Sequence, residues 1–203
     1  MTATNRGAER SPSDFYPTPY NATYSLLRAL PELEHLAGPE GRWLEPCIGS
    51  GAILYAAENY YTRTGITPPS WYGVDVNPLP PMVNPPRLLS FQLMDFLECD
   101  FPQSIDCIVT NPPFSLVQPM ITKAQQLCDV VIMLLQPNFL GSQKRSEWWQ
   151  GNEPDQILVL SERPFPDSTE YAWFVWGIPP REKAIRVLPP FTWHETKQMR
   201  LAI

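Results

Sequence analysis

The chain has 203 residues, of which 43% are hydrophobic, a composition typical of one globular domain with a substantial core. No apolar run approaches the roughly 18 residues that span a bilayer, and the polar N-terminus lacks a signal-peptide core, so we expect a cytoplasmic protein. The formal net charge of −6 disfavours broad contact with a polyanion such as nucleic acid. Basic residues nearly balance acidic ones only in residues 102–203, which have nine Lys and Arg against ten Asp and Glu. We therefore expect any nucleic-acid-binding face in this half of the chain.

Predicted strands and helices alternate along the chain. Residues 1–13 are polar and unpatterned, which predicts a disordered or loosely docked tail. An amphipathic helix is predicted from Asn21 to about Leu36, kinked or ended early by Pro31. Strands are predicted at Arg42–Pro46, Trp71–Val76, Leu88–Met94, Ile105–Thr110, Val130–Gln136, Gln156–Leu160 and Tyr171–Trp176, and the helices between them at Gly51–Thr62, Ser115–Leu127 and Ser142–Gln150.

This alternation predicts an α/β fold with a mostly parallel seven-stranded sheet that helices cover on both faces. The last two strands have no helix between them, which predicts an antiparallel hairpin at the sheet edge. We interpret the proline-rich segments 78–86 and 179–190 as connectors. The prediction is therefore a single domain over residues 14–190, followed by a C-terminal tail over residues 191–203.

The four cysteines lie at positions 47, 99, 107 and 128, with no Cys-x-x-Cys spacing and no closely spaced histidines. This pattern predicts buried cysteines and neither a metal site nor a disulfide framework.

Two motifs together predict a cofactor that contains a nucleoside. The first strand runs through Glu45 into a turn with Gly49 and Gly51, where backbone can approach a ligand and a helix N-terminus offers unpaired amides. A tight strand–helix turn also needs glycine for conformational reasons alone, so this motif by itself is weak evidence. The second strand ends at Asp75, and an acid at this position can accept both hydroxyls of a ribose.

A third motif, Asn111-Pro112-Pro113-Phe114, follows a buried strand. Methyl transfer to an aromatic amine is difficult because the nitrogen lone pair is delocalised into the ring. The side-chain carbonyl of Asn111 and the backbone carbonyl of Pro112 could accept the amine hydrogens and direct the lone pair at a methyl donor. The prolines would fix that geometry, and Phe114 offers a face on which a base can stack. The alternative is a Pro-Pro turn that only ends the strand.

In this order, the motifs resemble those of the small phage-type DNA adenine methyltransferases in the gamma arrangement, over roughly residues 14–180. The resemblance implies a Rossmann-like class I methyltransferase fold, S-adenosylmethionine as cofactor, DNA as partner, and the cytoplasm of a bacterial or phage-infected cell. The matching segments are DFYPTP at 14–19, LEPCIGSG at 44–51, GVDVNP at 73–78, MDFL at 94–97, NPPF at 111–114 and YAWFVW at 171–176.

The resemblance also implies residue roles around the cofactor. A closing segment over its methionine end would comprise Tyr16, Thr18 and Pro19. The amino-acid and ribose region would be lined by Glu45, Gly49 and Gly51, with Asp75 on the ribose hydroxyls. Asp95 would accept the adenine amino group and Phe96 would cover the adenine ring. For these last two residues a turn cap and core packing, respectively, are the alternatives.

The target base would be held by Asn111, Pro112, Pro113 and Phe114. Because the amino group of a paired adenine is stacked and engaged, the base must be flipped out or single-stranded. Within residues 140–146, Lys144 and Arg145 are expected in the first turn of a helix, where the dipole disfavours cations and DNA phosphate would relieve the conflict. Two solvated cations on a short helix are the alternative.

The predicted elements leave no room for a separate recognition domain. We therefore expect either a relaxed context of one to three bases or recognition completed by a homodimer or a second subunit. Two other functions stay open. One is methylation of RNA or of a protein glutamine amide, although the FYPTP segment ahead of the glycine loop is typical of the DNA group. The other is an inactive binding subunit, although such proteins usually lose the acid or the Asn-Pro-Pro-aromatic turn, and both are present here.

Overall fold

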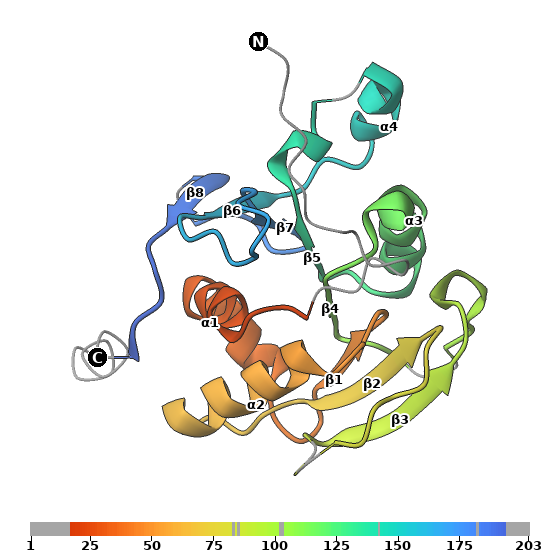
Figure 1. The fold of residues 1–203 in the computed structure, drawn as a ribbon, viewed down its shortest axis with the longest axis vertical. Coiled ribbons are helices and arrows are strands. Elements are labelled where there is room, and N and C mark those ends of the chain that lie inside the picture. The colour runs from red at the N-terminus through yellow and green to blue at the C-terminus, as the bar shows by residue number, and fades with distance from the viewer. Residues whose placement is uncertain are drawn as a thin grey trace.

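The computed structural model describes residues 17–82, 84, 86–101, 104–141, 143–181 and 183–193. These residues form one sheet of eight strands in the order β3-β2-β1-β4-β5-β7-β6-β8 (Figure 1). The strands are β1 Arg42–Glu45, β2 Ser70–Asp75, β3 Leu88–Leu93, β4 Cys107–Thr110, β5 Val131–Leu135, β6 Gln156–Leu160, β7 Ala172–Trp176 and β8 Ile185–Leu188.

The helices are short and lie mostly between the strands. They are α1 Tyr20–Ala29, α2 Ala52–Thr64, α3 Val117–Leu127 and α4 Ser146–Trp149, with 3-10 turns η1 Pro31–Leu36, η2 Phe96–Glu98, η3 Phe114–Leu116, η4 Pro137–Phe139 and η5 Gln143–Arg145. Pro31 ends the first helix, as expected, and starts a 3-10 turn. In the described part of the chain, no helix has the length and apolar character needed to cross a membrane.

The sheet is mostly parallel, as the sequence predicts. From β3 to β5 all neighbouring strands are parallel, and β7 runs antiparallel to both β5 and β6. The predicted antiparallel hairpin, β6 with β7, is confirmed.

The sheet has eight strands, one more than the seven predicted. An eighth strand, β8, pairs in parallel with β6 and lies outside the hairpin, within the segment interpreted as a connector. Two of its four residues, Ile185 and Val187, are 63% and 69% exposed. Its conformation therefore depends on pairing with β6, and a short exposed edge strand among prolines shows no burial pattern in the sequence.

Both faces of the sheet are covered, because successive side chains of a strand point to opposite faces. In β5, Ile132 and Leu134 belong to the core shared with α1 and α2, whereas Val131, Met133 and Leu135 belong to the core shared with α3 and α4. Figure 1 shows α1 and α2 on one side of the central strands and α3 on the other.

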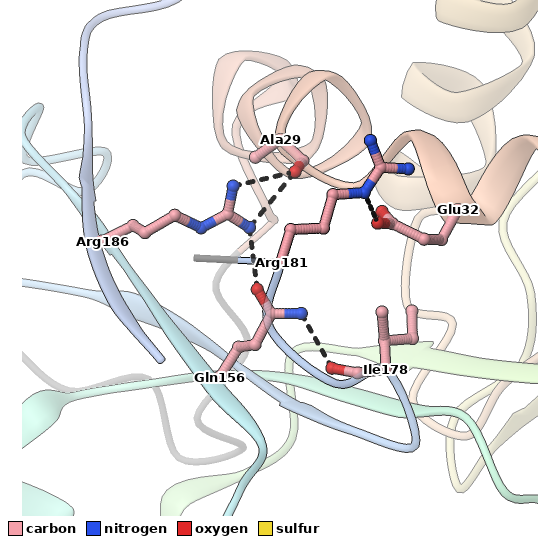
Figure 2. A network of polar contacts seen from close by, with 6 residues as sticks. All are labelled: Ala29, Glu32, Gln156, Ile178, Arg181 and Arg186. Carbon is pink, nitrogen blue, oxygen red and sulfur yellow. Dashed lines mark hydrogen bonds and ion pairs between the residues drawn. The ribbon is translucent and has the colours of Figure 1, made fainter. Parts of the chain in front are cut away.

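A polar network ties the C-terminal end of α1 to the last strands (Figure 2). Both terminal nitrogens of Arg186, on β8, donate to the Ala29 carbonyl at 3.2 Å, and one also donates to Gln156 Oε1 at 2.9 Å. Nearby, Arg181 forms an ion pair with Glu32. Carbonyls in the last turn of a helix lack helical partners, so Arg186 caps α1 and anchors it against β6 and β8. This anchoring holds α1 in place, and the segment that precedes α1 reaches the candidate site.

The packed region extends beyond the predicted domain boundary at residue 190. Phe191 is buried, and its ring centroid lies 5.0 Å from that of Tyr24 on α1. Trp193 packs on the same tyrosine at 5.0 Å. The predicted N-terminal tail, residues 1–13, and residues 194–203 of the predicted C-terminal tail, 191–203, lie outside the described residues.

Candidate functional site

A cavity of about 130 Å³ opens at the carboxyl ends of β1, β2 and β4. Carboxyl ends of parallel strands meet at one edge of a sheet, which is where α/β folds bind ligands. The cavity gathers most of the residues predicted for the site: Thr18, Glu45, Gly49, Asp75, Asp95, Phe96, Asn111 and Pro113. Residues separated by more than 90 positions in sequence thus share one cavity.

The segment before α1 contributes one wall. Pro17 and Thr18 both line the cavity, and Thr18 is only 5% exposed. Pro19 does not line it and instead occupies the N-cap position of α1, where its carbonyl accepts a hydrogen bond from Ala22 N at 3.0 Å. Tyr16, the remaining residue of the predicted closing segment, lies outside the described residues.

The glycine turn has the tight geometry expected from its sequence. Gly49 and Gly51 have φ angles of 49° and 75°, in the left-handed region that favours glycine. Gly49 lines the cavity, whereas Gly51 is not among its lining residues. Gly51 is the N-cap of α2, where its positive φ favours glycine for conformational reasons.

Asp75 joins the glycine turn to the end of β2. Its Oδ2 accepts a hydrogen bond from Gly49 N at 2.8 Å, and its Oδ1 accepts one from Asn77 N at 2.8 Å. Oδ1 also accepts a hydrogen bond from Asn77 Nδ2 at 3.1 Å, so these bonds orient the carboxylate and leave one of the two acceptor sites of Oδ2 for a ligand hydroxyl. Asp75 therefore shapes the cavity as well as lining it.

Glu45 places a carboxyl group in the interior beside the cavity. The residue is 3% exposed, and among the described residues Oε2 has no hydrogen-bond partner. Burial, and secondarily the charge of Asp75, raises the Glu45 pKa well above its usual range. An unpartnered buried acceptor fits a ligand that brings a cationic or hydrogen-bond-donating group.

Asp95 and Phe96 each have a structural role and also line the cavity. Asp95 caps η2 by accepting a hydrogen bond from Leu97 N at 2.9 Å, and Phe96 is buried in the core at 4% exposure. Both residues also line the cavity. Structural and ligand-contact roles are therefore compatible at both positions.

The Asn-Pro-Pro-Phe motif contributes residues to two hollows. Asn111 and Pro113 line the first cavity, while Pro112 is buried and absent from its lining. Phe114 is absent from that lining and instead lines a second hollow. Its ring centroid is 6.1 Å from that of Tyr171, at an interplanar angle of 35°.

Hydrogen bonds fix the ring that packs on Phe114. The Tyr171 hydroxyl donates to Asp167 Oδ2 at 3.0 Å and accepts from Gln136 Nε2 at 3.4 Å. Tyr171 itself is 2% exposed. The hairpin loop between β6 and β7 is thereby held against the Asn-Pro-Pro-Phe motif.

Several lining residues were missed in the sequence. Val76 and Met94 line the cavity and are 67% and 37% exposed, so apolar surface faces the ligand side. The signal was an apolar residue directly after the acid at the end of β2 and another directly before Asp95. Cys47 also lines the cavity, and burial, with the charges of Asp75 and Glu45, raises the pKa of its thiol, which keeps it protonated and unreactive.

The two predicted DNA-binding cations occupy a different setting from the one expected. They fall in η5, and the helix that follows, α4, has only four residues, so they do not lie in the first turn of a longer helix. Lys144 is exposed. The guanidinium carbon of Arg145 lies 4.0 Å from the Phe139 ring centroid, and its Nε donates to the Phe139 carbonyl at 3.1 Å. The two side chains therefore have different surroundings.

Comparison with known proteins identifies the fold. No family model and no curated protein sequence matches the chain. A putative class I S-adenosylmethionine-dependent methyltransferase from Listeria monocytogenes superposes with a TM-score of 0.60 at 14% identity, over 89% of this chain and 67% of that one. A putative RNA methyltransferase from Pyrococcus horikoshii gives 0.60 at 16% identity, over 84% and 88%.

A type I restriction-modification methyltransferase subunit from Streptococcus thermophilus also gives a TM-score of 0.60, at 14% identity, over 93% of this chain. The chain spans 52% of that subunit, about half its length. Similarity at this level of identity concerns the fold alone. The chain has the Rossmann-like fold of class I methyltransferases, as its sequence predicted.

Proposed function

We propose that this protein is an S-adenosylmethionine-dependent methyltransferase that acts on the exocyclic amino group of adenine in DNA. The observation that carries the proposal is the shared cavity. It brings an acid at the end of β2, a glycine turn and a buried carboxyl group together with Asn111 of the Asn-Pro-Pro-Phe motif. A site for a nucleoside-containing cofactor thus adjoins a site suited to a planar amine.

The lining residues fit S-adenosylmethionine in charge and polarity. The Glu45 carboxyl, whose Oε2 has no partner among the described residues, suits the ammonium group of the methionine end, and Thr18 can bond its carboxylate. Asp75 suits the ribose hydroxyls. Asp95 can accept from the adenine amino group, while Val76 and Phe96 offer apolar contacts to the ring.

The bound cofactor would supply a methyl group on a positively charged sulfur. The chain's own task is to position the amine. Asn111 and the carbonyl of Pro112 would accept the two amine hydrogens, which turns the nitrogen lone pair toward the methyl group. As the nitrogen–carbon bond forms and the carbon–sulfur bond breaks, the nitrogen becomes acidic and releases one proton to water, so no general base is required.

DNA is the favoured substrate because the motifs resemble those of phage-type DNA adenine methyltransferases, and one structural neighbour is a restriction-modification subunit. RNA is the second candidate, since another neighbour is described as a putative RNA methyltransferase. Recognition of the target site would depend either on a second subunit or on a relaxed context of one to three bases.

The test has two parts. Calorimetry with S-adenosylmethionine measures cofactor binding, and labelled methyl transfer is then compared on duplex DNA, single-stranded DNA, RNA and protein. We expect binding and transfer to adenine in DNA. Transfer to RNA alone would mean that RNA, not DNA, is the substrate. Failure to bind the cofactor would refute the proposal and favour an inactive binding subunit.

A further inference from the structure

A second hollow adjoins the Asn-Pro-Pro-Phe loop at Phe114. It encloses about 80 Å³ beyond the carboxyl end of β5, and we call it the Arg145 hollow. Its lining residues are Phe114, Val117, Leu135, Gln136, Asn138, Phe139 and Arg145. Asn111 and Pro113 line the first cavity and Phe114 lines the second, so this one loop contributes to both.

Arg145 is held in place in this hollow. Its guanidinium lies over the Phe139 ring at 4.0 Å, and its Nε is bonded to the Phe139 carbonyl at 3.1 Å. It is half-buried, and with the residues that the structure describes it forms no ion pair. Stacking and the Nε bond fix the plane of the guanidinium, while its terminal nitrogens have no hydrogen-bond acceptor among the described residues. A partly buried cation without a carboxylate favours a ligand that supplies acceptors.

The remaining lining groups match the edge of a nucleobase. Phe114 and Phe139 provide aromatic surface, and Gln136 and Asn138 provide amide groups that both donate and accept. One water needs about 10–15 Å³ of such space, so the hollow has room for several waters or for the edge of a planar ring. A guanidinium fork pairs best with two acceptors side by side, as on the O6 and N7 edge of guanine.

We propose that the Arg145 hollow binds the base adjacent to the methylated one, and that Arg145 makes methyl transfer depend on a guanine at that position. The inference rests on the proposed function and specifies its substrate. It also separates the two neighbouring cations. Arg145 reads a base, whereas the exposed Lys144 contacts only the backbone.

The test uses single-stranded oligonucleotides with one adenine and every combination of bases on its two sides. The kcat/KM for labelled methyl transfer is measured for each with the parent protein, Arg145→Lys, Arg145→Gln and the matched control Lys144→Ala. Because one bidentate base contact discriminates by about 1–3 kcal/mol, we expect the parent to prefer guanine on one side by about 5- to 150-fold. Arg145→Lys keeps the charge but loses the planar fork, and Arg145→Gln loses both.

Both Arg145 variants should reduce the preference to within about twofold while their cofactor affinity and melting temperature match those of the parent, and Lys144→Ala should keep it. A parent that methylates adenine equally in every context would overturn this inference and leave the proposed function intact. So would an Arg145→Lys or Arg145→Gln variant that keeps the guanine preference. A parent that binds the cofactor but methylates no nucleic acid would instead remove the proposed function, and this inference with it.

Discussion

Replacing Glu45 by glutamine should stabilise the protein without cofactor and weaken cofactor binding. The residue is 3% exposed, one carboxyl oxygen has no partner among the described residues, and its pKa is raised by burial and then by the charge of Asp75. Glu45→Gln keeps the shape of the side chain and removes the charge. The two expected effects have opposite signs, which a simple packing defect would not produce.

The pH dependence follows from the direction of the pKa shift. A raised folded-state pKa means that the folded protein binds more protons than the unfolded chain, so stability decreases as the pH rises above the ordinary glutamate pKa of 4.5. Leaving a buried polar group unsatisfied costs about 1–3 kcal/mol. Glutamine still buries a polar group, so we expect it to recover about 1 kcal/mol at pH 8, a melting temperature about 2–4 °C higher for a chain of this length.

The assay is thermal unfolding without cofactor between pH 4.5 and 8.5, with calorimetric titration of S-adenosylmethionine alongside. The advantage of Glu45→Gln over the parent should be greatest at pH 8 and disappear near pH 4.5. Affinity for the cofactor should fall by at least about tenfold, the equivalent of about 1.4 kcal/mol, because its ammonium group loses a carboxylate partner. Glu40→Gln, at an exposed position, is the matched control and should change neither quantity.

Two results would refute this reasoning. A lower melting temperature for Glu45→Gln at pH 8 would mean that the carboxylate is already stabilised in the protein without cofactor. Unchanged affinity would mean that Glu45 does not face the cationic end of the ligand.

The remaining predictions concern the cofactor, the chemistry and the nucleic-acid contact. Asp75→Ala should weaken S-adenosylmethionine binding at least about tenfold in calorimetry, because it removes a carboxylate that also accepts a hydrogen bond from Gly49 N of the glycine turn at 2.8 Å. Unchanged affinity would mean that the ribose binds elsewhere. Asn111→Ala should abolish methyl transfer while cofactor affinity stays within about threefold of that of the parent, since the proposed contact of Asn111 is to the target amine. Activity above a few per cent of the parent's would contradict the mechanism. Lys144→Ala should reduce the slope of log affinity for DNA against log salt by about 0.7–0.9, one phosphate contact, whereas equal slopes for the parent and the variant would rule that contact out.

The local pattern of the chain was sufficient to predict much of the fold and several of the residues that line the cavity. Runs such as Val131–Leu135, buried on both faces, are recognisable because parallel strands in a covered sheet need apolar residues throughout. Glu45, Asp75 and Asn111 each follow or end such a run. Since carboxyl ends of parallel strands meet at one edge, the sequence predicts that these three side chains lie near one another.

Other features depend on contacts between distant segments. Strand β8 exists because it pairs with β6, and its exposed Ile185 and Val187 give no sign of this in the sequence. The packing of Phe114, which was expected to offer a face for the target base, also depends on such a contact, because its ring centroid lies 6.1 Å from that of Tyr171.

By itself, the sequence determined the α/β class, the parallel sheet and the order of the motifs, because each of these follows from neighbouring residues and from strand direction. Only the tertiary structure decided which of the two adjacent cations, Lys144 and Arg145, would be exposed to solvent and which would pack on an aromatic ring. Lys144 stays exposed, whereas the stacking of Arg145 on Phe139, six residues earlier, gives it a fixed place beside the Asn-Pro-Pro-Phe motif. The physical reason is that the surroundings of a side chain depend on which residues the fold packs against it. The identity and spacing of charged residues in the sequence do not specify those neighbours.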